Sequence, residues 1–239
     1  MKKLLLSVFL TAAVFSNLPA QKTINDPNAE KRDLNGFHGI EVSTGIKLFL
    51  TEGTTEEVAV SAATTGFRDK IITKVENGIL KIHYENKFFS MNTRKEKKEL
   101  KAYVSYKTLD RLNANTGAEV EIEGVLKSTA LKMNVNTGAI VKGQVNTDDL
   151  QVDQDTGSIV TLTGDASKLD VEGDTGSIFK GSGLNTNNCN AKASTGAGVY
   201  IMVQKELSVK ANTGGFVKYK GDAGIREIKT NTGGSVSKI

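Results

Sequence analysis

The sequence contains a single cysteine, Cys189, and no long apolar run after its first twenty residues. A secreted chain with one cysteine cannot form an internal disulfide, so its stability has to come from a packed core and backbone hydrogen bonds. Without a second apolar run, we expect no membrane span in the mature chain. Cys189 takes a repeat position that is otherwise leucine, which favours a buried small hydrophobe over a reactive thiol.

The chain also lacks a large excess of charge of either sign. It has 31 basic and 27 acidic residues, and without Lys2 and Lys3 it keeps 29 basic ones. The basic residues alternate with acidic ones and few aromatics accompany them, which excludes a typical nucleic-acid-binding surface. The densest basic run, Arg94 to Lys98, indicates a solvated loop.

Residues 1–20 have the features of a secretory signal peptide. Lys2 and Lys3 form the charged start, a short apolar stretch follows, and Ala20 is a small residue at the expected cleavage position. No cysteine lies near that position, which excludes a bacterial lipid anchor there. We therefore predict export to the periplasm, the cell surface or the extracellular space.

The main feature of the chain is a repeat of 18 to 21 residues. Its most regular part is a tripeptide that ends in Thr-Gly, with threonines at 116, 137, 156, 175, 195, 213 and 232. The positions four residues before and four residues after each threonine are apolar, and most positions between them are polar. A fixed period near 20 is typical of a solenoid.

The alternation of apolar and polar residues predicts short strands with one buried face, two strands per copy. One copy cannot bury its apolar face alone, so copies should stack into a right-handed parallel β-helix of seven to eight rungs. A glycine in each corner suits a positive φ, or a place where a Cβ would meet the next rung. The leucine-rich-repeat spacing is absent, and a sandwich or barrel fits the period less well.

The rest of the chain divides around this solenoid. We expect a flexible lead-in at 21–36 and one β-helix domain at 37–239, with an irregular insertion at 51–104 and regular rungs at 105–239. Thr44 lies in an outlying eighth copy. Asn77-Gly78 predicts a hairpin, because type I′ turns need positive φ at both central positions. We expect the insertion to cap the N-terminal end, with a helical turn between Gly66 and Lys74.

Two motifs in this region point to a known family. Phe37-x-x-Ile40-x-Val42 with Gly45-Ile46-x-Leu48, and Val75-x-x-Gly78-x-Leu80-x-Ile82, precede the Thr-Gly rungs. In this order they resemble the putative autotransporter adhesins with a head GIN domain, over residues 31–239. The resemblance implies an exported β-helix and no established activity. No autotransporter barrel follows Ile239, so we do not expect the chain to carry itself through an outer membrane.

The enzyme class that a β-helix most readily suggests is one that cleaves polysaccharides. Polysaccharide lyases need a cationic base, usually arginine, but no arginine occurs between Arg111 and Arg226. For a hydrolase the best carboxylate pair is Asp155 and Asp174, which share a column in adjacent rungs. Two stacked carboxylates would titrate high or share a cation such as Ca²⁺. Corner capping is the alternative that we favour, and we predict no catalytic residue and no cofactor.

The sequence therefore predicts a non-catalytic, adhesin-like interaction protein that binds a glycan or a cell-surface protein. A polysaccharide lyase or hydrolase with a minimal acidic site is the alternative. Exposed aromatics that could contact a ligand are few, with Tyr200, Phe216 and Tyr219 as the candidates. The last rung has no obvious cap, so we also expect a homo-oligomer through the C-terminal strand edge.

Overall fold

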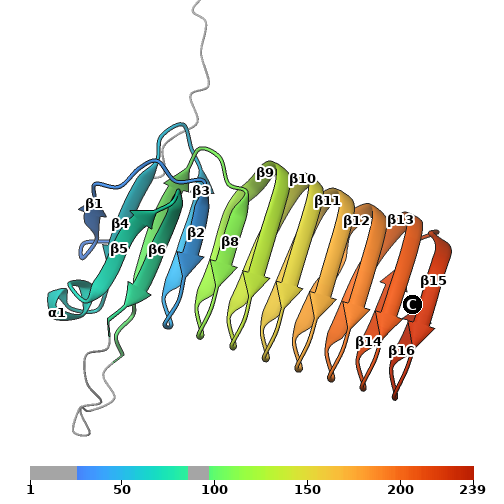
Figure 1. Ribbon diagram of the computed structural model, residues 1–239. Coiled ribbons are helices and arrows are strands. Elements are labelled where there is room, and N and C mark those ends of the chain that lie inside the picture. Colours follow the sequence, from blue (N-terminus) through green and yellow to red (C-terminus); the bar gives the residue numbers. More distant parts are fainter. Residues whose placement is uncertain (1–25, 86–96) are drawn as a thin grey trace, which may run out of the picture.

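The protein is an elongated stack of strands, seen in Figure 1 from the capped N-terminal end to the last coil. The computed structural model describes residues 26–85 and 97–239, and this part forms the parallel β-helix that the repeat predicted. Its regular strands are β8 (Arg111–Ala114), β9 (Glu119–Val135), β10 (Ile140–Gln154), β11 (Ile159–Gly173), β12 (Ile178–Ala193), β13 (Gly198–Ala211), β14 (Phe216–Lys220), β15 (Gly224–Thr230) and β16 (Ser235–Lys238).

The coils of β9 to β13 are each one continuous strand that runs from one corner to the next, whereas the following coil is divided into β14 and β15. We expected two short strands per copy, but β9 to β13 each bend in the middle without losing their pairing to the neighbouring coils. Equivalent positions stack in register, so that Val141 lies between Val120 and Val160. Some pairs also contain a small register shift, such as the one between Lys142 and Gln144, whereas β10 and β11 pair without one.

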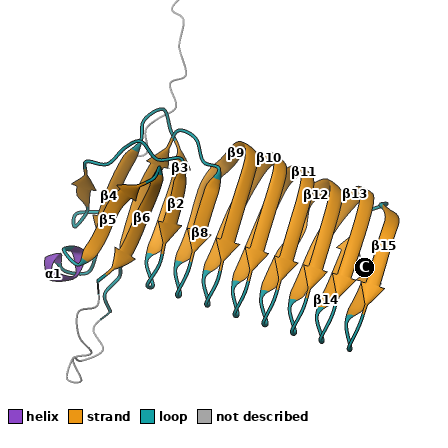
Figure 2. Cartoon of the chain, viewed as in Figure 1, coloured by secondary structure: helices purple, strands orange, loops and turns teal. Residues whose placement is uncertain are grey.

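The Thr-Gly corners are tight turns along one edge of the stack, drawn as loops in Figure 2. At the corner of Asn115 to Ala118, Thr116 has φ 50° and Gly117 has φ 71°, and the Ala118 N–H donates to the Asn115 carbonyl at 3.1 Å. Positive φ at both central residues is the mark of a type I′ turn. A Cβ on Gly117 would meet no atom within 4 Å, so the glycine is needed for its φ and not to avoid a clash.

The corners are also bonded to one another along the axis. The Gly117 N–H donates to the Thr137 carbonyl at 3.0 Å, and the same bond recurs from the corner of Thr44 to that of Thr232. Thr44 (φ 64°) therefore belongs to a true eighth copy, as predicted. A ladder of this kind needs every corner to keep the same backbone conformation.

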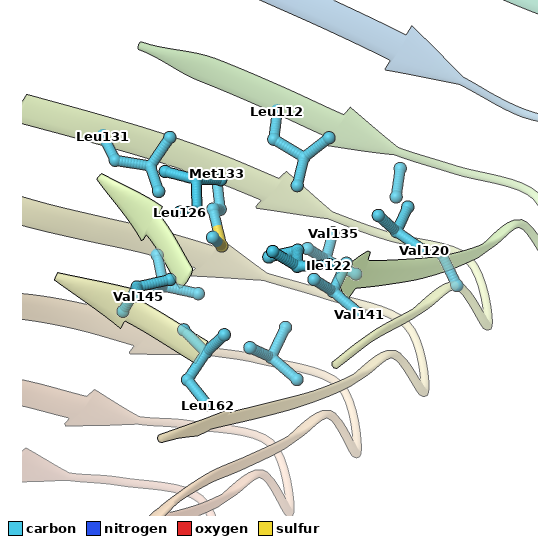
Figure 3. Packing of buried hydrophobic residues seen from close by; sticks show 14 of the residues in the cluster. Leu112, Val120, Ile122, Leu126, Leu131, Met133, Val135, Val141, Val145 and Leu162 are labelled. Atoms are coloured by element: carbon cyan, nitrogen blue, oxygen red, sulfur yellow. The ribbon is translucent and has the colours of Figure 1, made fainter. Parts of the chain in front are cut away.

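The core fills the wedge between the two sheets that meet at the corners (Figure 3). Small buried residues stand next to the corner, as at Ala118, Ala139 and Ser158, and larger ones such as Leu131 and Met133 lie deeper. This taper explains why alanine, serine or glycine follows Thr-Gly in the seven copies from Thr116 to Thr232, whereas Ile46 follows it in the first copy. Cys189 is 3% exposed within this core, and burial raises the pKa of its thiol well above its usual range, so it packs as the expected small hydrophobe.

The predicted insertion caps the N-terminal end of the stack. Its strands are β4 (Glu57–Ser61), β5 (Ile71–Glu76), β6 (Ile79–Tyr84) and β7 (Lys101–Tyr106), beside β2 (Gly39–Val42) and β3 (Lys47–Glu52). β6 and β7 run parallel to β2 and β3 and continue the two sheets, while β5 and β4 cover them in the antiparallel sense. The hairpin turn at Asn77-Gly78 is confirmed. The helical turn expected between Gly66 and Lys74 is found only at the start of that range, as α1 (Thr65–Arg68), since Ile71 to Lys74 belong to β5.

The lead-in is more ordered than expected. Residues 1–25, which include the predicted signal peptide, lie outside the described part of the chain. Within the predicted flexible segment 21–36, however, β1 (Glu30–Arg32) pairs with β4, and Asp26 accepts a hydrogen bond from Tyr103 at 2.9 Å. These contacts between distant segments gave no periodic signal in the sequence. In the described ranges no helix is long and apolar enough to cross a membrane.

Candidate functional site

The two candidate catalytic carboxylates serve as corner caps. Asp155 accepts a hydrogen bond from the Thr156 N–H at 2.6 Å, and Asp174 accepts one from the Thr175 N–H at 2.7 Å. The Thr175 hydroxyl of the next coil and the Thr156 N–H lower the pKa of the Asp155 carboxyl, where we had expected stacked carboxylates to raise it. The position before each corner threonine thus has a capping role, which the asparagines and the serine at the other corners can also fill.

The outward acidic column beside it is also paired. Lys192 Nζ lies 3.2 Å from Glu172, and Lys132 Nζ lies 3.4 Å from Asp153. In residues 26–85 and 97–239, no three His, Cys, Asp or Glu side chains gather closely enough to hold a metal ion. The structure therefore places these carboxylates in lateral ion pairs rather than around a common point.

A shallow pocket of about 550 Å³ lies at the N-terminal end of the stack, beside the Thr44 corner. Two of its three lysines already face acids, since Lys47 pairs with Glu119 at 3.4 Å and Lys101 with Asp26 at 3.5 Å. Its third lysine, Lys98, lies over the Tyr84 ring at 4.3 Å. Because its cations are used internally, this pocket offers little for recognising a ligand.

A surface better suited than this pocket to contact a ligand lies on the outside of the strands that follow the corners. We call it the post-turn face, and define it as the side chains three and five residues after the corner threonines from Thr137 to Thr213. Its members are Ile140, Lys142, Ile159, Thr161, Ile178, Lys180, Gly198, Tyr200, Phe216 and Lys218. The strand register stacks them in two parallel columns along the axis.

The first column of the post-turn face is apolar although it points away from the core. Ile140 is 38% exposed, and Ile159 and Ile178 follow it in register, each partly exposed. The next position is Gly198, and the Phe216 ring of the following coil lies where a Gly198 Cβ would be. The result is a continuous apolar strip.

Two of the three candidate aromatics meet on this face. Tyr200 and Phe216 pack edge to face with ring centroids 5.6 Å apart, and Lys218 Nζ lies 5.8 Å and 5.7 Å from the two centroids. Tyr219, the third, is partly buried against the core and does not join them. The sequence offered Tyr200 and Phe216 as separate candidates, and the stacking of adjacent coils brings their rings together.

Acidic side chains are absent from the strands that follow the corners in five successive coils. Residues 138–147, 156–164, 175–187, 195–205 and 213–221, which carry the post-turn strands, contain no Asp or Glu but include Lys142, Lys180 and Lys218. Lys142 is paired with Glu119 at 3.2 Å and Glu121 at 3.5 Å in the preceding coil. Neither Lys180 nor Lys218 forms an ion pair with any described residue. The far half of the face is therefore cationic and apolar.

A family model described as putative auto-transporter adhesin, head GIN domain, matches residues 36–223. The chain belongs to this family. The match spans the capped first coils as well as most of the regular ones, so the insertion is part of the head GIN domain and not an addition to it. No curated protein matches the sequence.

Solved structures resemble the head GIN domain along nearly its whole length. A putative adhesin from Bacteroides fragilis is 17% identical, with 88% of this chain and 95% of that one covered and a TM-score of 0.79. A putative adhesin from Parabacteroides distasonis is 15% identical, with 88% and 96% covered and a TM-score of 0.69. A putative lipid binding protein from the same species is 18% identical, with 90% and 98% covered and a TM-score of 0.59. At these identities the likeness shows the fold alone.

The isoleucine column of the post-turn face is the feature that sequence reasoning missed. Ile140, Ile159 and Ile178 stand three residues after their threonines, so the repeat itself placed them in one column. Apolar residues are expected in the inward columns of a stacked coil, so an apolar outward column was the unusual signal in the sequence.

Proposed function

We propose that this head GIN domain is an exported, non-catalytic binding protein that presents the post-turn face to a glycan or a cell-surface protein. The observation that supports this most is the apolar strip from Ile140 to Phe216, flanked by Lys180 and Lys218. Exposed apolar strips bordered by polar groups are typical of interaction surfaces. The strip extends over several coils, as suits a long or flat partner better than a small substrate.

The test is a glycan and polysaccharide screen on the mature chain, with and without Ca²⁺, that measures binding and product release together. We expect binding without product release. The double variant Asp155→Asn/Asp174→Asn should bind unchanged, because asparagine already occupies the same corner position at Asn115 and Asn136. Product release that disappears in this variant would contradict the proposal and identify a carbohydrate-active enzyme.

We also propose that two copies associate through the C-terminal strand edge. β15 pairs only with β13, and β16 only with β14, within the described chain. Ile225, Ile228 and Ile239 are 45%, 44% and 56% exposed at this end. An exposed strand edge is a template for pairing. Since β4 and β5 cover the opposite end, the two copies would meet with equivalent surfaces, as in a two-fold dimer.

Sedimentation equilibrium over a range of concentrations tests this association. We expect a concentration-dependent dimer in the parent chain and a shift to monomer in Ile228→Lys, because a charge on a strand edge opposes pairing. Ile140→Lys makes the same change on the lateral surface and should leave association unaltered. A parent chain that remains monomeric at the highest concentrations would contradict the proposal.

A further inference from the structure

The post-turn face carries a charge pattern with a period of two coils. Its outer column follows the strand register as Lys142, Thr161, Lys180, Tyr200 and Lys218, and Ser237 continues this column in the last coil, beyond the face. A lysine therefore alternates with a hydroxyl-bearing residue along the axis. Neighbouring strands of a sheet lie about 4.8 Å apart, which separates successive lysines by roughly 9.6 Å at their backbones.

The residues between and beside these lysines offer hydrogen bonds and apolar contacts to the same partner. Thr161, Tyr200 and Ser237 can each donate or accept a hydrogen bond between the lysine levels. Two residues earlier on the same strands, Ile159, Ile178 and the Phe216 ring offer apolar and aromatic contacts at nearly every level. A partner that fits both columns has apolar faces, hydroxyl groups and negative charges that recur at every second unit.

From this geometry we infer that the post-turn face binds a linear acidic polysaccharide along the solenoid axis, with one carboxylate per disaccharide. This rests on the proposed function, and it names the ligand class of the same face. An extended pyranose unit is about as long as the distance between two strands, so alternate sugars meet alternate lysines. Lys180 and Lys218 are the cations of the site, since Lys142 is already held by Glu119 and Glu121.

The spacing disfavours denser polyanions. Duplex DNA carries a charge every ~1.7 Å of its axis, far more closely than one cation per two coils. A polysaccharide with a carboxylate on every sugar would place half of its charges opposite Thr161 and Tyr200, where no cation compensates their desolvation. The face therefore distinguishes between acidic polysaccharides by the spacing of their carboxylates as well as by their negative charge.

The experiment compares hyaluronan, in which glucuronate alternates with a neutral sugar, with polygalacturonate and neutral dextran, by calorimetry on the full mature chain. We expect the affinity to be highest for hyaluronan and to fall as salt is raised. Lys180→Gln/Lys218→Gln should weaken hyaluronan binding by at least about ten-fold, because two charge-assisted contacts are lost. Lys192→Gln/Lys210→Gln removes the same charge from the opposite sheet and should change little.

A third variant tests the spacing itself. Thr161→Lys gives lysine at three successive coils, Lys142, the new one and Lys180, so it should shift the preference toward polygalacturonate by several-fold. All of these side chains are at least partly exposed, so the thermal midpoint serves as a check that the variants remain folded.

Several outcomes would overturn the inference. Hyaluronan binding that is equal in the parent and in Lys180→Gln/Lys218→Gln, or equally weakened in the control pair, would place the ligand elsewhere. Binding only to vesicles that contain an anionic phospholipid would identify a membrane surface instead. Binding to a neutral glycan or a protein alone would refute the acidic ligand and leave the proposed function standing. No binding to any of these probes or to the wider screen would count against both.

Discussion

Gly164→Ala is expected to destabilise this protein strongly, although it adds a single methyl group. Gly164 has φ +104°, and a Cβ there would overlap the carbonyl oxygen of Val145 in the preceding coil. That oxygen belongs to the backbone of a stacked strand and cannot rotate away. Strain at this φ and overpacking of the coil together should cost about 3–5 kcal/mol of unfolding free energy.

Gly157→Ala provides the matched control for this substitution. Gly157 also has a positive φ, +69°, but a Cβ there would meet nothing within 4 Å. Only the left-handed conformation opposes the change, at about 1–2 kcal/mol. Urea unfolding of both variants against the parent measures the difference. Equal loss of stability in the two would mean that the coils can move apart around Gly164, contrary to our account.

Replacing corner threonines by asparagine is expected to stabilise the protein. A β-branched residue at positive φ is strained, whereas asparagine tolerates this region well. In the triple variant Thr116→Asn, Thr137→Asn and Thr213→Asn, we expect about 1 kcal/mol per corner. For a chain of this length the thermal midpoint should rise by about 6 °C or more. No side-chain hydrogen bond of these three threonines is found in the described part of the chain, so the change removes none.

One corner of this protein already has asparagine in the position of the threonine. Asn77 and Gly78 form a corner of the same kind in the β5–β6 hairpin, with φ 51° and 73°. Asn77→Thr should therefore lower the thermal midpoint, in the opposite direction to the triple variant. If the triple variant melts below the parent, the stacked threonine side chains contribute packing that exceeds their backbone strain.

The strain also bears on function. All eight corner threonines, Thr44 included, have φ between 44° and 64°, although asparagine would be the less strained choice. Strained residues persist where the surrounding structure holds them in place. Here the ladder of Gly N–H to Thr carbonyl bonds does so. The same ladder keeps the coils in register, and the two-coil period of Lys180 and Lys218 depends on that register.

Much of the architecture followed from the sequence because it depends on local rules. The Thr-Gly period predicted the number of corners, and the apolar columns four residues before and after each threonine predicted the buried faces. Asn77-Gly78 predicted the hairpin, since few residue pairs adopt two positive φ values. These features need only a backbone preference and an alternation of side chains, which are present in any single copy of the repeat.

The remaining features came from neighbours in space. Gly164 is required because Val145 lies on the adjacent coil, and the insertion places β6 and β7 at the end of the two sheets. The lead-in strand β1 forms because β4 offers it an edge. The ring of Phe216 covers Gly198 because the two coils stack in register, which creates the apolar strip. Such contacts depend on which coils lie side by side and how their side chains fill the space between them.

By itself, then, the sequence determined the repeating coil, its buried columns and its corners, since these are set by backbone preferences and hydrophobic alternation within about twenty residues. Only the tertiary structure decided that the Thr175 hydroxyl of the next coil reaches Asp155, that Tyr200 and Phe216 meet, and that Lys180 and Lys218 share one acid-free face. These are relations between coils, and the side-chain contacts that define them exist only after the coils have stacked.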